Sequence, residues 1–257
     1  MPYASAVLKV VPGNFFLMTM RSRILVSTLL AALLAPLSIR GQDGPAPALL
    51  GAPLAGFTLP VLQGGELSPA QLRGKNLLLF FPRGRVGPDH WCQICSYQYA
   101  ELAELEAAQH LRAKYNLEVV FVLPYDRALV AEWAAKLPDQ LKIIDGWKNP
   151  ADPAKLDEKG RRWMEFTRRI FPKTVVLPPG AAATPFPILI DADRAVSKRF
   201  GLFTTEWDHA KIDQNIPTVL IVDPQGVVRF KYFSQNTFDR PDFPYLFRFL
   251  ERMVIAN

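Results

Sequence analysis

The chain has 257 residues, of which 49% are hydrophobic and 21% charged, so it is long enough to bury the core of one large domain. This composition excludes intrinsically disordered and collagen-like proteins. The two cysteines are too few for a disulfide scaffold or a four-cysteine zinc site. Beyond the first forty residues, no apolar run reaches the length of a membrane span.

The net charge of +6 is unevenly distributed along the chain. The first 41 residues carry four bases and no acid, so the rest has 26 Lys and Arg against 24 Asp and Glu. Residues 141–180 hold nine bases and five acids. We interpret this segment as a solvated helical insertion, with a docking surface for an acidic partner as the alternative. We expect no nucleic-acid partner.

Residues 1–41 are typical of a secretory signal peptide. A short basic stretch precedes the uncharged run Ile24–Ile39, and Gly41 is a small residue at the expected cleavage point. Met18 or Met20 is an alternative start. We expect an exported protein, periplasmic or secreted. An uncleaved leader would anchor it in a membrane, the one case in which we expect membrane contact, and a buried N-terminal helix is the remaining alternative.

Residues 42–56, rich in Pro, Ala and Gly, predict a flexible tether before a folded domain at 57–257. Within this domain, apolar and amphipathic segments alternate. The sequence predicts strands at Asn76–Phe81, Glu118–Leu123 and Phe186–Ile190, helices at Cys92–Lys114, Arg127–Leu137, Arg194–Phe200 and Tyr245–Val254, and a hairpin of Thr218–Val222 with Val227–Tyr232.

This order of elements predicts an α/β fold with a central mixed β-sheet flanked by helices. Residues 138–185 form an interval far longer than an ordinary connection between a helix and a strand. We expect an insertion there, carrying its own helix around Lys159–Ile170.

Cys92 and Cys95 carry the clearest chemical signal. A bridge between them would close a very small loop and constrain the unfolded chain little, so we expect it to serve chemistry. Cys92 lies at the predicted start of a helix, where free N–H groups and the helix dipole favour a thiolate, and Cys95 is placed to attack a mixed disulfide. We expect a pair that cycles between dithiol and disulfide. A static disulfide, buried free thiols and a metal site are the alternatives, whereas haem attachment is excluded because Ser96 follows.

His90 lies two residues before Cys92 and leaves three interpretations open. It could join both cysteines in a metal cluster, help hold the thiolate as an imidazolium, or be a plain loop residue. His110 and His209 are expected at the surface. We expect neither a metal nor a cofactor.

Several segments occur in an order that resembles the thioredoxin-like superfamily. The chain is similar to its alkyl hydroperoxide reductase/thiol-specific antioxidant (peroxiredoxin-like) branch and to its periplasmic thiol-disulfide oxidoreductases. The segments are Leu54–Gly74, Asn76–Pro82, Trp91–Cys95, Phe186–Leu202 and Asn215–Tyr232. The resemblance implies a thioredoxin-like fold in which Pro217 is a cis-proline beside the cysteine pair.

Peroxiredoxins have a Pro-x-x-x-Thr/Ser-x-x-Cys signature, and this chain has Pro88, Cys92 and Cys95 at those three positions. The resemblance therefore implies a peroxidatic Cys95 and a resolving Cys92. The family also has an arginine where this chain has Pro217. Arg83 or Arg85 could replace it as a donor that steadies the thiolate and the peroxide.

The sequence therefore predicts an oxidoreductase that exchanges disulfides or, like a peroxiredoxin, reduces peroxides as an antioxidant. Its substrate would be a disulfide or a peroxide, and an unidentified thiol would supply electrons. The alternative is a non-enzymatic copper-binding or partner-docking module, to which only His209 could add a distant ligand. The expected catalytic residues are Cys92, Cys95 and Pro217, and the expected supporting residues are Trp91, His90, Pro88, Arg83 and Arg85.

Overall fold

The computed structural model describes residues 48–175, 177 and 185–255. The expected signal peptide at 1–41 lies outside these residues. Within the described ranges, no helix combines the length and apolar character needed to cross a membrane.

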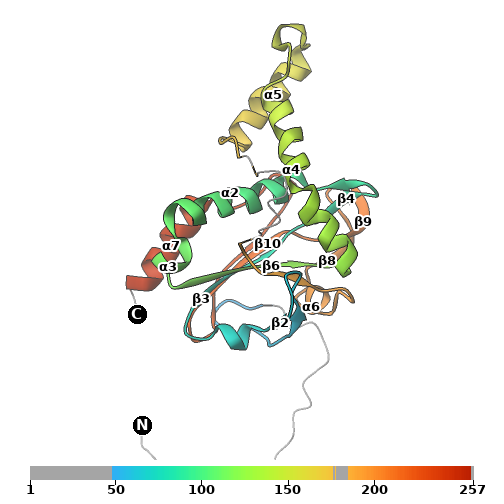
Figure 1. The fold of residues 1–257 in the computed structure, drawn as a ribbon. Helices are drawn as coiled ribbons and strands as arrows, with labels where there is room; N and C mark the ends of the chain where they lie inside the picture. The colour runs from blue at the N-terminus through green and yellow to red at the C-terminus, as the bar shows by residue number, and fades with distance from the viewer. Residues whose placement is uncertain (1–47, 176, 178–184, 256–257) are drawn as a thin grey trace, which may run out of the picture. The chain divides into compact units, whose positions relative to one another are not determined.

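A mixed sheet of five strands, in the order β11-β10-β3-β6-β7, forms the centre of the fold (Figure 1). Strands β3, β6 and β7 are mutually parallel, whereas β10 is antiparallel to both of its neighbours. All five strands were predicted from sequence, with β3 and β10 at the observed bounds. The strands are β3 (Asn76–Phe81), β6 (Leu117–Leu123), β7 (Ile188–Ile190), β10 (Thr218–Val222) and β11 (Val228–Phe233).

Side chains along the central strands alternate between two apolar cores, as the period of a strand requires. On one face, Leu78 and Phe80 of β3 pack with residues of helices α2, α4 and α7. On the other face, Leu77 and Leu79 pack with the N-terminal segment and α6. The α-helices are α2 (Gln93–Gln109), α3 (Leu111–Lys114), α4 (Arg127–Lys148), α5 (Glu158–Ile170), α6 (Ala195–Arg199) and α7 (Phe243–Ile255), and the 3-10 helices are η2 (Pro69–Leu72) and η3 (Pro153–Lys155).

The end of the expected tether is packed onto the domain. Ala48 and Leu54 are buried, and the N–H groups of Gly51 and Leu54 donate to the carbonyls of Val228 and Gly226 at 2.8 and 2.9 Å. The prediction of a flexible tether is therefore wrong from residue 48 onward, because apolar side chains in this Pro-rich stretch cover one face of the sheet. Two short antiparallel strands follow, β1 (Leu59–Pro60) and β2 (Glu66–Leu67).

Two predicted helices have different bounds in the structure. The helix expected at Cys92–Lys114 is divided into α2 and α3 at His110, whose φ of 50° and ψ of 50° are left-handed. The helix expected to end at Leu137 continues through Pro138 as far as Lys148. Leu141 and Ile144, beyond the proline, are buried against the start of α2, and this packing offsets the cost of a proline inside a helix.

In the described part of the predicted insertion, 138–175 with 177 and 185, the helices are the second half of α4, η3 and α5, whereas residues 176 and 178–184 lie outside the described residues. Helices α4 and α5 run side by side away from the sheet (Figure 1), and the rings of Trp147 and Trp163 meet between them at 5.4 Å. Asp157 caps α5 by accepting from the N–H of Gly160 at 2.7 Å. The expected helix around Lys159–Ile170 is thus confirmed. We call α4 and α5 together the helical arm.

Two hairpins were not predicted. Strands β8 (Phe203–Trp207) and β9 (Ala210–Asn215) are joined by Asp208 and His209, which both have positive φ in a turn that contains no glycine. Because glycine is the usual sequence signal for such a turn, the hairpin was not evident. The second hairpin joins the short strands β4 (Arg85–Gly87) and β5 (His90–Trp91).

Replacing His110 with glycine should raise the free energy of unfolding by about 0.5–1 kcal/mol, since glycine adopts a left-handed backbone without a steric penalty. Urea unfolding followed by circular dichroism measures the change. The control is Ala107→Gly, at an exposed position inside α2, which should lower the free energy by about 1 kcal/mol. If His110→Gly lowered the free energy of unfolding as much as Ala107→Gly does, the left-handed backbone at His110 would carry no steric cost.

Candidate functional site

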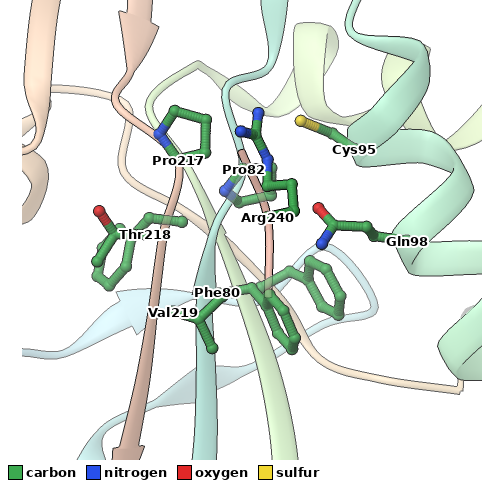
Figure 2. A pocket seen from close by; sticks show the side chains of 10 residues that line it. Phe80, Pro82, Cys95, Gln98, Pro217, Thr218, Val219 and Arg240 are labelled. Atoms are coloured by element: carbon green, nitrogen blue, oxygen red, sulfur yellow. The ribbon is translucent and has the colours of Figure 1, made fainter. Parts of the chain in front are cut away.

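The two cysteines lie where the carboxyl end of β3, the amino end of β10 and the first turn of α2 meet. Cys92 is the N-cap residue of α2, and Cys95 follows within the first helical turn. Each residue is only 2% exposed. A pocket of about 260 Å³, including its opening to solvent, is lined by Cys95 and by residues of all three elements (Figure 2).

The sulfur atoms of Cys92 and Cys95 lie 2.9 Å apart and share a hydrogen bond between two free thiols. The backbone N–H of Arg83 also donates to the Cys95 sulfur, at 3.3 Å. The N–H of Cys92 donates instead to the carbonyl of Gly84, at 2.8 Å. The loop after β3 therefore holds both cysteines from one side, and it directs its donor to the Cys95 sulfur.

These contacts separate the pKa values of the two thiols. Burial opposes ionisation of Cys95, but the hydrogen bond with Cys92, the charge of Arg240 and the N–H groups of Arg83 and Gly84 outweigh it and lower the pKa to about 6. The hydrogen bond with Cys95 and then burial raise the pKa of Cys92 well above its usual value. When the pair loses one proton, the remaining proton stays on Cys92. Electrostatics thus favour a Cys95 thiolate, in contrast to the expectation that the helix start would activate Cys92.

Arg240 is the cation that faces this thiolate, and it was not identified from sequence. It lies in the loop between β11 and α7 and lines the pocket opposite Cys95 (Figure 2). Its Nη1 donates to the carbonyls of Asn236 and Asp239 at 3.1 and 2.8 Å, whereas Nε and Nη2 are buried and have no hydrogen-bond partner among the described residues. Two charged donors are therefore available beside Cys95. No local motif marks this arginine, because it lies far from Cys95 in the sequence.

The guanidinium groups of Arg83 and Arg85 are engaged elsewhere, which corrects their expected role. Arg83 is buried, and its guanidinium donates to Gln214 and Thr237 at 2.6 and 2.7 Å. It also donates to the carbonyl of Trp207 at 2.8 Å and lies over that residue's ring. Arg85 lies over the ring of Trp91. Arg83 acts on the cysteines only through its backbone N–H.

Pro217 lies in the pocket lining with Cys95, but its peptide bond is trans, as all peptide bonds of the described residues are. The expected cis geometry is therefore wrong. Only Ile216 and Pro217 separate β9 from β10, and the N–H of Ile216 donates to the Leu202 carbonyl at 2.7 Å. The chain thus passes from one strand into the next without a tight turn.

The other expected supporting residues frame the site from outside the pocket. Trp91 is buried, and its indole N–H donates to Glu132 at 3.2 Å. Pro88 forms part of the exposed turn between β4 and β5, and His90 is exposed on β5. We interpret Trp91 as the residue that anchors this hairpin to the domain.

Gly84, in the loop before the cysteines, occupies a position that has no room for a side chain. Its φ is +80°, and a Cβ atom there would lie 2.5 Å from the ring of Tyr125. The Tyr125 hydroxyl accepts from the N–H of Arg85 at 2.8 Å and donates to the Asp213 carbonyl at 2.9 Å. This tyrosine fixes the loop that directs a backbone N–H to Cys95.

Residues of the insertion lie in the same apolar cluster as the cysteine pair. Phe171 and Val175, which follow α5, are buried in one apolar cluster with Cys92, Cys95 and Ile144 of α4. The insertion is therefore part of the site.

Histidines do not complete a metal site with the cysteines. The side chain of His209 is 98% exposed on the turn between β8 and β9, whereas both cysteines are buried. Among the described residues, no group of three or more His, Cys, Asp and Glu side chains is arranged to hold a metal ion. The structure thus does not bring His209, the distant ligand of the copper-binding alternative, to the cysteine pair.

Comparison with known families gives a match over residues 50–231 to the AhpC/TSA family. The chain belongs to this family. Membership supports a peroxiredoxin-like redox role and agrees with the thioredoxin-like fold. No curated protein matches the chain.

One solved peroxiredoxin structure resembles this AhpC/TSA protein in fold, and two more match it with lower scores. A cysteine-to-serine mutant of peroxiredoxin 6 from Arenicola marina is 13% identical, with a TM-score of 0.53 over 81% of this chain and 74% of that chain. The reduced 2-Cys peroxiredoxin of Plasmodium vivax is 14% identical, with a TM-score of 0.48 over 81% and 83%. The yeast mitochondrial 1-Cys peroxiredoxin is 13% identical, with a TM-score of 0.48 over 81% and 77%.

Alkylation with iodoacetamide should distinguish the two thiols. Cys95 should react with a midpoint near pH 6, and Cys92 should react only at high pH. Cys92→Ala should move the Cys95 midpoint upward, because it removes the hydrogen bond to the thiolate, whereas Cys92→Ser retains a donor. Mass spectrometry assigns each modified residue, and faster labelling of Cys92 below pH 7 would contradict the assignment.

Proposed function

We propose that this protein reduces small hydroperoxides, with Cys95 as the peroxidatic residue and Cys92 as the resolving residue. The observation that carries the proposal is the pocket that Cys95, with its lowered pKa, shares with Arg240, whose Nε and Nη2 groups are buried and have no hydrogen-bond partner within the described ranges. A thiolate is the reactive form of cysteine. A positioned cation stabilises negative charge that develops on a leaving oxygen.

The proposed cycle has three steps. The Cys95 thiolate attacks the distal oxygen of the hydroperoxide, the O–O bond breaks, and the alkoxide leaves and takes up a proton, which yields an alcohol and a Cys95 sulfenic acid. The Cys92 thiol then attacks this sulfur, a disulfide forms, and water is released. An external thiol reductant finally supplies two electrons and two protons, is itself oxidised to a disulfide, and restores both cysteines.

Burial of the pair supports a small substrate over a protein disulfide. Exchange with a protein requires one of its sulfur atoms to reach Cys92 or Cys95 in line with the bond that breaks. Both cysteines are 2% exposed, and Phe171 and Val175 are buried in the same apolar cluster. A hydroperoxide group needs only the space beside Cys95 and Arg240.

The resolving role of Cys92 is supported by distance and by protonation. Its sulfur lies 2.9 Å from that of Cys95 and keeps its proton while Cys95 is ionised. It therefore does not compete for peroxide, and it can form the disulfide without a large movement of the chain. The first helical turn supplies both partners.

Rapid mixing of the reduced protein with an alkyl hydroperoxide tests this function. The wild-type protein should consume peroxide and form the Cys92–Cys95 disulfide. Cys95→Ser should abolish the reaction, and Cys92→Ser should consume one equivalent and stop at a sulfenic acid that dimedone traps. Arg240→Met should slow the first step by about 100-fold. The rate should fall as pH drops below about 6, because protonation removes the thiolate.

A comparison with an insulin-like disulfide substrate separates the two redox classes. The proposal requires turnover of peroxide in the presence of a thiol and much slower reduction of insulin. Fast insulin reduction without peroxide consumption would replace it with a disulfide-exchange role. An unchanged peroxide rate in Arg240→Met would remove this arginine from the mechanism.

A further inference from the structure

Arg240 belongs to the loop of residues 234–242, which we call the arginine loop. Most of the hydrogen bonds that hold this loop come from residues outside the helical arm. The Asp239 carboxylate accepts from the Tyr232 hydroxyl and, at 2.7 Å, from the N–H of Gln235. The N–H of Thr237 donates to Asp208 at 2.5 Å, and its hydroxyl accepts from Arg83. These bonds fix the loop on either side of Phe238.

Phe238 itself is held from the helical arm. Its ring lies perpendicular to that of Phe166, with the ring centres 4.8 Å apart, and 6.4 Å from the ring of Trp163. Trp163 in turn contacts Trp147 of α4. Phe238 and Trp163 nevertheless remain 40% and 39% exposed. We call Phe238, Phe166 and Trp163 the aromatic clamp.

The position of the Arg240 guanidinium is coupled to the backbone of the arginine loop. Its Nη1 is bonded to the carbonyls of Asn236 and Asp239, which lie on either side of Phe238. A displacement of Phe238 therefore moves the donors that face Cys95. Because the energy between two charges depends on their separation, and strongly so in a buried site, a small displacement weakens the stabilisation of the thiolate.

We propose that the helical arm positions Arg240 for chemistry at Cys95, and that the aromatic clamp transmits this positioning. Phe238, Phe166 and Trp163 are positioning residues, since none of them lines the pocket. The proposal rests on the proposed function for the role of Arg240 toward peroxide. The insertion then has two effects on the site, because Phe171 and Val175 pack in the apolar cluster of the cysteine pair while α5 holds the arginine loop.

The test measures the pH profile of Cys95 alkylation in Phe238→Ala, in Phe166→Ala and in the double variant. Each single variant should raise the Cys95 midpoint by about half a pH unit or more, because Arg240 stabilises the thiolate less well. The double variant should show the same shift as Phe238→Ala alone, since removal of the Phe238 ring already removes its contacts with both Phe166 and Trp163. Phe238→Tyr retains a ring and should restore the wild-type midpoint.

The matched control is Phe57→Ala, which removes a partly buried ring paired with Phe200 on the opposite face of the sheet. It should leave the midpoint unchanged. A wild-type midpoint in folded Phe238→Ala, or an equal shift in Phe57→Ala, would overturn the proposal. If Phe238→Ala does not fold, Phe166→Ala on the exposed arm decides the question alone.

Alkylation does not require peroxide, so the test separates the two proposals. Failure of the protein to reduce peroxides would overturn the proposed function, while a shifted midpoint would still support the positioning of Arg240. Peroxide reduction with unshifted midpoints would overturn only the positioning role. With both intact, the peroxide rate of Phe238→Ala at pH 6 should fall by more than its rate at pH 8, since the thiolate fraction changes most near the midpoint.

Discussion

The contact between the two cysteine sulfur atoms is the interaction on which the proposed chemistry depends. Two sulfur atoms 2.9 Å apart cannot both ionise without strong repulsion, so the environment decides which of them keeps the proton. Burial opposes ionisation of Cys95, but the hydrogen bond with Cys92, the charge of Arg240 and the backbone donor of Arg83 lower its pKa, whereas the hydrogen bond with Cys95 and burial raise the pKa of Cys92. The roles proposed for the two cysteines follow from this asymmetry.

The asymmetry is built from segments that are distant in the sequence. The loop after β3 gives a backbone N–H, and Tyr125 together with Gly84 fixes that loop. The loop before α7 gives a guanidinium. Residues of the insertion lie in the apolar cluster of the pair, and the insertion contacts the loop that carries the guanidinium. The buried central strands of the sheet provide a rigid base, and the two loops and the insertion are held on it.

The sequence predicted what is encoded locally. The apolar runs at Asn76–Phe81 and Thr218–Val222 are the central strands, and the Cys-x-x-Cys motif lies at the start of a helix as expected. Tertiary contacts decided the rest. Burial of Leu141 and Ile144 carries α4 past Pro138, and a left-handed His110 divides a helix that has no other signal for a break.

The same division between local sequence and tertiary contacts holds for the candidate site. Cysteine spacing predicted a redox pair, and the structure places the two sulfur atoms 2.9 Å apart, but the helix start alone favoured Cys92 as the thiolate. The pKa order depends on the hydrogen bond between the two thiols and on the backbone N–H groups of Arg83 and Gly84, and the charge of Arg240 lowers the pKa of both cysteines; none of these contacts is visible in the motif. Sequence proximity also favoured Arg83 and Arg85 as the cation, whereas their guanidinium groups serve the β8–β9 hairpin and Trp91.

The short distance between the two sulfur atoms bears on how the protein would resist irreversible oxidation under the proposed cycle. A cysteine sulfenic acid that waits for a distant partner can meet a second oxidant and pass irreversibly to a sulfinic acid. In this protein the partner thiol is already in contact and needs no unfolding of α2. Under the proposed cycle, the Cys95 sulfenic acid has a short lifetime because the Cys92 thiol reacts with it before a second oxidant molecule does. The protein would therefore remain active at high oxidant concentrations.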